Sequence, residues 1–250
     1  MRSALQVWSR DTFLSSVPAI VYIETRNARG DLNIGTGFHV GEGVIVTARH
    51  VVEGREIRRI GPASADAWMR FFKDIDDLKQ LTHGNFSITS DIHFHENADV
   101  DVCCFKIKPH PTKALILGGH LDDFLGEFEL LLHRTLVLGF PRIPLSDRPA
   151  LVACSGEINA LVDMYTAHHP HFIISTMARG GFSGAPVMVA YDEENRANGT
   201  AVLGLVTESL VSDGAGVESG FMAVLTVEPI YGCLERAGML PEAQKIGPEQ

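Results

Sequence analysis

The sequence predicts an all-β protein. Many short segments have the composition of strands, and turn-forming residues such as glycine, proline, asparagine and aspartate separate them. This pattern is typical of a barrel or a sandwich. The chain has 250 residues, of which 45% are hydrophobic, so it can bury one large core or two small ones.

Twelve strands are expected, six in each half of the chain. The first six are Val17–Arg26, Asn33–Val40, Gly43–Ala48, Ala67–Phe72, Phe86–His95 and Asp101–Lys108. The first two are joined by a hairpin turn over residues 27–31, in which Gly30 can take a positive φ without strain. Residues Lys113–Leu125 then cross to the second half.

The second half is expected to end in a helix. Its six strands are Glu129–Leu138, Ala150–Leu161, Phe172–Met177, Ala185–Ala190, Ala201–Thr207 and Phe221–Val227. The helix is predicted over Pro229–Ala237, because Gly238 and Pro241 follow it as stop signals.

Three segments carry the residue types of a serine nucleophile with its base and its acid. In chain order they are Thr47–Val52 with His50, Asp101–Lys106 with Asp101, and Gly180–Pro186 with Ser183. A serine hydroxyl is a poor nucleophile at neutral pH, because its proton must leave as it attacks. A nearby histidine takes that proton, and an aspartate fixes the tautomer of the imidazole and stabilises the imidazolium. The small residues around Ser183 let the backbone turn sharply and present the N–H groups of Gly181 and Ser183 to a developing oxyanion.

These segments resemble those of trypsin/chymotrypsin-fold serine proteases, and they are nearer to the bacterial Deg/high-temperature-requirement branch than to secreted trypsins. The segments that match the family pattern are Gly35–Val40 with Val44–Val52, Asp101–Ile107 and Gly181–Pro186. The similarity as a whole spans residues 17–228. Two residues depart from the family pattern. Phe182 replaces the usual Asp or Asn and removes a polar partner from the loop, and Ala185 replaces a glycine, which requires that its φ is not positive.

The resemblance implies two six-stranded antiparallel β-barrels packed together, with a C-terminal helix. It divides the chain into an N-terminal segment 1–16, a first barrel 17–108, an inter-barrel linker 109–128, a second barrel 129–228, and a helix and tail 229–250. The Deg branch often carries a PDZ module after the protease domain. We expect none in this sequence, because about 22 residues beyond the last strand are too few for such a module.

The acid of the triad could be either of two aspartates. Asp99 and Asp101 lie two residues apart and therefore share one face of their segment. We favour Asp101, because the apolar run of residues 102–105 begins directly after it, as in the family. Asp99 is then expected to be a solvated loop charge.

Substrate-binding residues follow from the resemblance alone. It implies that Met177 forms the base of the pocket for the substrate side chain and that Gly220 lines the wall. It also implies that the segment with Thr207, Glu208 and Ser209 pairs with the substrate backbone, so that the substrate adds as a strand. Methionine offers no charge to a basic side chain, so a weak preference for apolar residues is expected, although Glu208 could contribute a charge.

Charge, cysteine content and the N-terminal sequence indicate which partners and which cellular compartment to expect. The formal net charge is −10 and no basic run is present, so nucleic acid is not an expected partner. Cysteines 103, 104, 154 and 233 form neither a disulfide framework nor a CxxC pair and are expected to be buried thiols in a reducing compartment. Polar residues interrupt residues 1–24, and no segment is long and apolar enough for a signal peptide or a membrane span. A cytoplasmic location without a membrane partner is expected.

Two groups of histidines could in principle bind a metal. His93 and His95 share a strand face beside Glu96, and a second group consists of His168, His169 and His171 around Pro170 in an expected loop. Neither group has cysteine ligands or a complete ligand set. No metal and no cofactor are therefore expected, and the second group could instead touch substrate or a partner.

Two functions from different classes remain. The first is a serine endopeptidase that hydrolyses protein or peptide substrates through His50, Asp101 and Ser183 and an acyl-enzyme. The second is a trypsin-fold binding or regulatory module whose triad is misaligned or is activated by a protein partner. Activation by a new N-terminus is not expected, because Phe182 stands where the pairing aspartate would be, so ordering of a loop is the more natural control. An esterase is a distant third, because the Gly-x-Ser-x-Gly elbow is absent.

Overall fold

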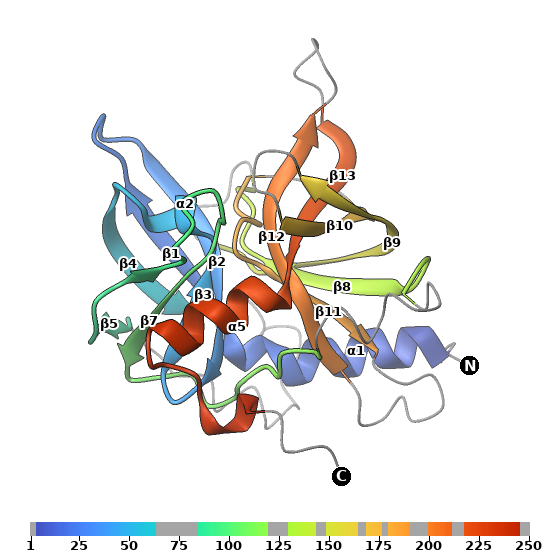
Figure 1. Cartoon of the computed structure of the whole chain (residues 1–250), viewed down its shortest axis with the longest axis horizontal. Coiled ribbons are helices and arrows are strands. Elements are labelled where there is room, and N and C mark those ends of the chain that lie inside the picture. The colour runs from blue at the N-terminus through green and yellow to red at the C-terminus, as the bar shows by residue number, and fades with distance from the viewer. Residues whose placement is uncertain are drawn as a thin grey trace.

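The protein is built from two β-structures that lie side by side, as the computed structural model of the chain shows (Figure 1). The structure describes residues 4–63, 85–119, 130–143, 149–164, 169–176, 180–190, 200–211 and 218–245. Within them, one half is a curled seven-stranded sheet and the other is a closed six-stranded barrel. The pairs between these strands are antiparallel. The predicted all-β fold with two packed barrel-like halves and a C-terminal helix is confirmed, and the first half has seven strands in a curled sheet where a six-stranded barrel was predicted.

The first half forms the curled sheet. Its strands are β1 (Ile20–Arg26), β2 (Leu32–Gly41), β3 (Val44–Thr47), β4 (Glu56–Pro62), β5 (Ser87–Ile88), β6 (His93–Phe94) and β7 (Cys103–Lys108). They run in the order β4-β1-β2-β3-β7-β5, and β6 also pairs with β7. The two edges of the sheet meet at one point, where the amide of Phe86 donates to Ile60 O at 2.9 Å. This contact curls the sheet toward a barrel.

The predicted hairpin between β1 and β2 is present, and its turn is held by one side chain. Asn27 Oδ1 accepts hydrogen bonds from the amides of Arg29 and Asp31, each at 2.9 Å. Gly30 takes a φ of +89°, which only glycine adopts without strain.

The second half forms the closed barrel. Its strands are β8 (Arg134–Gly139), β9 (Val152–Met164), β10 (His169–Ser175), β11 (Pro186–Ala190), β12 (Thr200–Val211) and β13 (Glu218–Thr226). The order around the barrel is β10-β13-β12-β11-β8-β9. The segment that connects the halves touches both of them, since Leu115 N donates to His39 O at 2.8 Å and Gly118 N donates to Val202 O at 2.9 Å.

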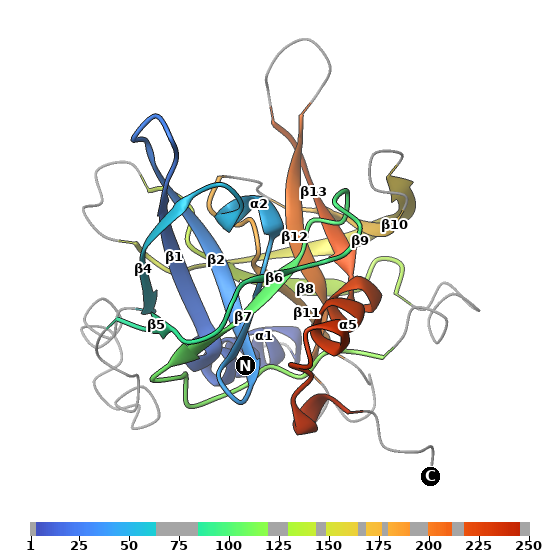
Figure 2. The same ribbon diagram turned by 60° about the vertical axis from the view of Figure 1, so that its left-hand side comes forward.

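Short helices complete the fold. In the described residues they are α1 (Ala4–Ser16), a 3-10 turn (Val17–Ala19), α2 (Arg49–Val52), α5 (Val227–Arg236) and another 3-10 turn (Glu242–Gln244). The helix α5 confirms the predicted C-terminal helix, and Gly238 follows it with a φ of +61°. The helix α2 lies at the opposite end of the sheets from α1 (Figure 2).

Several elements differ from the sequence predictions. The helix α1 and the strand β4 were not predicted; β4 is an edge strand, and its charged residues Arg58 and Arg59 hide the apolar pattern. The predicted strand 86–95 is broken into β5 and β6, and the predicted strand 17–26 begins with the 3-10 turn Val17–Ala19 before β1. The predicted strand 67–72 lies outside the described residues. The domain boundaries stay a prediction.

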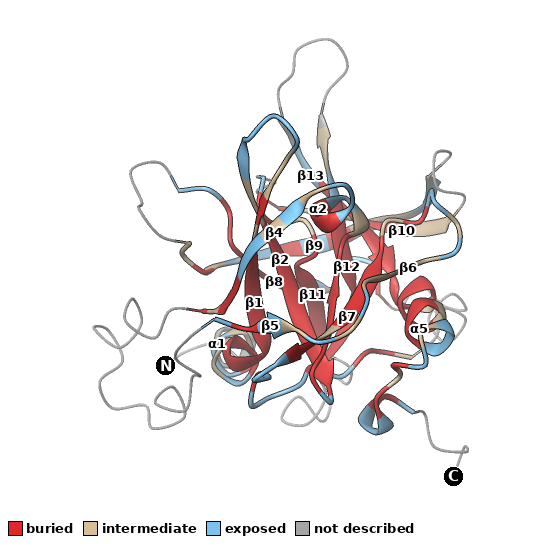
Figure 3. Ribbon diagram, turned by 90° about the vertical axis from the view of Figure 1, so that its left-hand side faces the viewer, coloured by how far each residue is buried: buried red, intermediate tan, exposed pale blue. Residues whose placement is uncertain are grey.

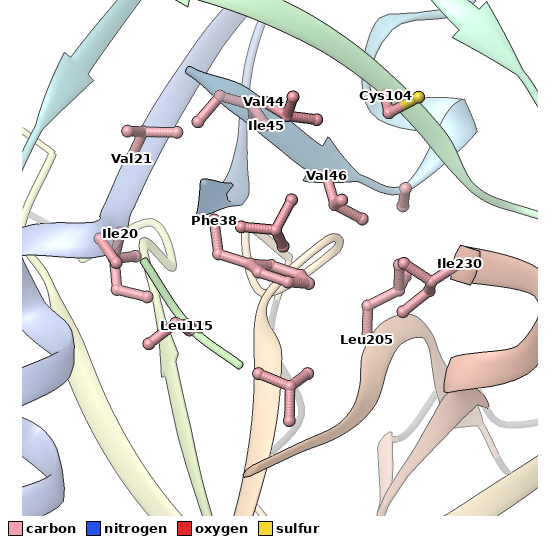
Figure 4. Close-up of a cluster of buried hydrophobic side chains, with 14 of the residues drawn as sticks. Ile20, Val21, Phe38, Val44, Ile45, Val46, Cys104, Leu115, Leu205 and Ile230 are labelled. Carbon is pink, nitrogen blue, oxygen red and sulfur yellow. The ribbon is translucent and has the colours of Figure 1, made fainter. Parts of the chain in front are cut away.

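One core joins the two halves. Buried residues are concentrated on the strands that face each other (Figure 3). Phe38 of β2 is fully buried in this cluster, with Leu205 of β12 and Ile230 of α5 among its members (Figure 4). Burial of this apolar surface fixes the halves against each other and therefore sets the relative positions of the predicted site segments.

Candidate active site

His50 lies on the short helix α2, directly after β3. Its neighbour Arg49 anchors the helix with three contacts. Arg49 Nη1 donates to His95 O at 3.2 Å, Nη2 donates to Glu53 Oε1 at 2.6 Å, and the guanidinium lies 4.9 Å from the ring centroid of Phe94. The sequence analysis missed this role of Arg49. The i,i+4 spacing of Arg49 and Glu53 was the signal that could have found it.

Asp101 makes two hydrogen bonds with His50. Its Oδ2 lies 2.6 Å from His50 Nδ1, and its Oδ1 accepts from the backbone N of His50 at 2.9 Å. Because an ionised carboxylate only accepts, Nδ1 carries the proton and Nε2 is left as an acceptor. Strand pairing sets this geometry, since β7 begins two residues after Asp101 and pairs with β3, which ends three residues before His50. Asp99 is exposed, and its amide donates to Asn97 Oδ1 at 3.0 Å.

Ser183 lies in the turn between β10 and β11. The turn needs two glycines, because Gly181 has a φ of +107° and Gly184 has a φ of +81°. Gly184 also approaches the first half closely, and a Cβ there would lie 2.9 Å from Ala48 N and would collide with Thr36 O. This close approach brings the Ser183 turn beside the segment that leads into His50.

The two departures from the family pattern have physical explanations. Positive φ values in the described residues outside glycine occur at Glu42 and Leu132, so Ala185 does not need the conformation that favours glycine. Phe182 is 3% exposed and packs into the core of the closed barrel, where a Cβ at Gly139 would lie 2.6 Å from its Cδ1. The turn is thus anchored by apolar packing at the position where the family usually has a polar residue.

The predicted oxyanion donors are the backbone N–H groups of Gly181 and Ser183, and the structure describes both residues. Within the described part of the chain, neither N–H group donates a hydrogen bond to a protein acceptor. The Ser183 carbonyl accepts a hydrogen bond from Thr36 N at 2.9 Å, which connects the turn to β2.

Four of the predicted substrate-binding residues lie on β12 and β13, namely Thr207, Glu208, Ser209 and Gly220. Val206 pairs with Val224 and Glu208 pairs with Ala223, so Thr207 is the extra residue of a β-bulge. The Thr207 hydroxyl is buried and donates to Ala223 O at 3.3 Å.

The side chains next to this bulge are more accessible. Glu208 is exposed and Ser209 is half-buried. Gly220 has a φ of +81° with open space around it, and its carbonyl accepts from Thr176 N at 3.0 Å. Met177, which follows Thr176, lies outside the described residues.

The histidine groups are distributed differently from the prediction. His169 and His171 lie on β10 and not in a loop, and His168 is outside the described residues. The ring of His95 lies 5.9 Å from that of His169, and His171 is buried, which lowers its pKa. In the described part of the chain, no three His, Cys, Asp or Glu side chains are grouped so that they could hold a metal ion.

All four cysteines are free thiols. Cys103 and Cys104 point to opposite faces of β7, since Cys103 Sγ contacts Ala48 O at 3.9 Å and Cys104 Sγ contacts Cys233 Sγ at 3.8 Å. Burial raises the pKa of the Cys103 thiol. Cys154 is half-buried.

Comparison with known proteins identifies the family. The sequence matches the trypsin-like peptidase domain over residues 35–197, and the chain therefore belongs to this family. It is a trypsin-like serine peptidase. A search of curated proteins gives no match.

Solved structures agree at the level of the fold. The active form of the Rv3671c protease from M. tuberculosis has a TM-score of 0.63 and 19% identity, covering 98% of this chain and 87% of that chain. Its inactive form has a TM-score of 0.60 and 18% identity, covering 93% of this chain and 95% of that chain. The HtrA-type protease AlgW with a tripeptide has a TM-score of 0.60 and 15% identity, covering 94% of this chain and 64% of that chain. The resemblance to the trypsin/chymotrypsin fold and to its Deg-type members is confirmed.

No helix in the described ranges has both the length and the apolar character required to cross a membrane.

Proposed function

We propose that this protein is a serine endopeptidase that cleaves peptide bonds through His50, Asp101 and Ser183. The observation that carries the proposal is the pair of hydrogen bonds that His50 donates to the Asp101 carboxylate, at 2.6 and 2.9 Å, together with a glycine-lined turn that presents Ser183. A bond of this kind fixes the tautomer that leaves Nε2 ready to accept the serine proton. Family membership supports the same chemistry.

The reaction proceeds in two halves. Ser183 Oγ attacks the carbonyl carbon of the scissile bond while its proton moves to His50 Nε2, and the carbonyl oxygen becomes an oxyanion facing the N–H groups of Gly181 and Ser183. The carbon–nitrogen bond then breaks, and the leaving amine takes the proton from His50. Water next attacks the ester carbonyl carbon while one of its protons moves to His50 Nε2. The bond from that carbon to Ser183 Oγ then breaks, Oγ takes the proton back from His50, and the acid product leaves.

The substrate is proposed to lie along β12 as an added strand. The bulge at Thr207 leaves Glu208 exposed and Ser209 half-exposed, so this part of the strand is accessible to a peptide. Met177 and Gly220 are proposed to form the pocket for the substrate side chain, and the Gly220 carbonyl accepts a hydrogen bond from the amide of Thr176, the residue before Met177. A cytoplasmic location and a regulatory partner stay predictions.

Labelling with a fluorophosphonate distinguishes the enzyme from the binding module. Such a probe reacts with a serine only when its base and oxyanion donors are aligned. We expect wild-type protein to be labelled and Ser183→Ala to remain unlabelled, with tandem mass spectrometry locating the adduct on Ser183. A folded wild type that is not labelled, at any probe concentration that labels trypsin, would favour the binding module instead.

A further inference from the structure

One threonine from the first half holds the turn that carries Ser183. Thr36 of β2 is fully buried. Its hydroxyl donates to Gly181 O at 2.7 Å and accepts from Phe140 N at 3.0 Å. Its backbone N donates to Ser183 O at 2.9 Å, and its backbone O accepts from Thr47 Oγ1 at 2.6 Å. The residue therefore connects β2 and β3 to two segments of the closed barrel.

The turn needs such a connection because two consecutive glycines give its backbone many accessible φ and ψ angles. Gly180 and Gly181 are consecutive glycines, and Gly181 has a φ of +107°. Without a Cβ, both can rotate between conformations at small cost. A rotation of the peptide unit between them would turn the Gly181 N–H away from the position where an oxyanion forms.

Both carbonyls of this glycine pair are held. Gly180 O accepts from Arg142 N at 3.3 Å, and Gly181 O accepts from the Thr36 hydroxyl. In a trans peptide the N–H points opposite to the preceding carbonyl, so the bond to Arg142 N directs the Gly181 N–H away from the segment 140–142. The Thr36 hydroxyl stabilises this same segment through Phe140 N.

Among the described residues of the turn, no other side chain offers this polar contact. Phe182, at the position where the family usually has Asp or Asn, is buried and apolar, so it anchors the turn without orienting a carbonyl. A hydroxyl is the smallest group that donates to one backbone atom and accepts from another at the same time. Serine can replace it, whereas valine has the same shape and can do neither.

We infer that Thr36 is a positioning residue whose hydroxyl keeps the Gly181 N–H oriented for the oxyanion, so that the site is formed without a partner or a new N-terminus. The inference rests on the proposed peptidase function. A loss of this orientation removes transition-state stabilisation and leaves substrate binding along β12 intact, so kcat should fall while KM changes little.

The test compares Thr36→Val, Thr36→Ser and a matched control, with kcat, KM and the unfolding midpoint measured for each on a fluorogenic peptide. The control is Thr135→Val in β8, because Thr135 is also fully buried and its hydroxyl donates to a glycine carbonyl, Gly156 O, at 3.1 Å. We expect Thr36→Val to lower kcat on the order of 100-fold, the loss typical of one oxyanion donor. Thr36→Ser should keep kcat within a few-fold of wild type, and Thr135→Val should lower the unfolding midpoint without changing kcat.

The possible failures are distinguishable. An inactive wild type overturns the proposed function and this inference together. An active wild type with Thr36→Val equally active, or with KM rather than kcat changed, overturns the inference alone. If Thr36→Val does not fold, Thr36→Ala removes the same hydroxyl with less volume. If neither folds while Thr135→Val does, the hydroxyl serves folding and the inference is wrong.

Discussion

His50 and Asp101 belong to one sheet, whereas Ser183 belongs to the other half of the molecule. The first two are positioned by neighbouring strands, β3 and β7, and they contact each other directly at 2.6 Å. Ser183 lies in a glycine turn that is held by the packing of Phe182 and by hydrogen bonds that reach across from Thr36. The proposed acid–base pair is therefore a local property of the first half. The position of the proposed nucleophile is a property of the contact between the halves.

This difference predicts which substitutions change the His50–Asp101 geometry and which change the position of Ser183. Changes within the first sheet that keep β3 paired with β7 should leave the His50–Asp101 geometry intact. Changes at the contact between the halves should move the nucleophile relative to that pair. The residues proposed for the substrate pocket belong to the second half, so specificity should vary without disturbing the proposed acid–base pair.

The largest expected effect comes from removing either the proposed nucleophile of the second half or the proposed base of the first half. Ser183→Ala and His50→Ala should each lower kcat for a peptide by a factor on the order of 10⁶, because nucleophile and base act as one unit. The double variant should be no slower than either single one. Single-turnover kinetics on one peptide checks this. A double variant slower by the product of both factors would show that the two residues act independently.

Replacing the acid tests the pair within the first sheet. Asp101→Asn should lower kcat by about 10⁴, the value for the template triad of this fold, because an amide favours the wrong tautomer of the imidazole. Asp99→Asn is the matched control and should cost little, since Asp99 is exposed and its amide contacts Asn97. If Asp99→Asn were the crippling change, the assignment of Asp101 would be wrong.

Short motifs on regular elements were the most predictable part of the molecule. The strand predicted over Gly43–Ala48 is present as β3, and the short helix α2 with His50 follows it. The stop signal at Gly238 likewise predicted the end of α5. In these places a local pattern decides the local structure.

Contacts between distant segments were not predictable. Nothing in Gly35–Phe38 indicates that the Thr36 hydroxyl reaches Gly181, since the two are 145 residues apart. The edge strand β4 escaped prediction because its exposed residues Arg58 and Arg59 interrupt the apolar pattern. The helix α1 is held by tertiary contacts such as Trp8 Nε1 with Thr200 Oγ1 at 3.2 Å. Such elements depend on packing partners that a local pattern does not contain.

A measurement of cleavage specificity tests the proposed pocket, which belongs to the second half alone. With Met177 at the base of the pocket, cleavage after Lys or Arg should be at least about 100-fold slower than after small or medium apolar residues, because an unpaired buried cation costs several kcal/mol. A peptide library read by mass spectrometry gives the profile. Met177→Asp should shift the preference toward basic residues while labelling of Ser183 persists. A wild-type profile dominated by Lys or Arg would instead point to Glu208 as the paired acid.

The smallest expected effect concerns a buried histidine of the first half, away from the acid–base pair. His39 Nε2 accepts from Gly43 N at 3.0 Å, and Nδ1 lies 2.6 Å from Lys113 O, so the ring is neutral with its proton on Nδ1. Burial lowers the pKa of His39, and His110, stacked at 5.6 Å, lowers it further.

The sign of the pH effect follows from the lowered pKa. In the unfolded chain His39 binds a proton below a pH of about 6.5, whereas the folded protein resists it to lower pH. The stabilisation is therefore full above pH 6.5 or so and is lost as the pH falls toward the lower folded pKa. Protonation also breaks the bond from Gly43, which contributes on the order of 1 kcal/mol. His39→Gln keeps a donor and an acceptor but does not titrate, so its free energy of unfolding should fall less than that of wild type between about pH 7 and pH 5. Urea titrations across this range measure both slopes, and equal slopes would show that His39 does not contribute to the acid sensitivity of the first half.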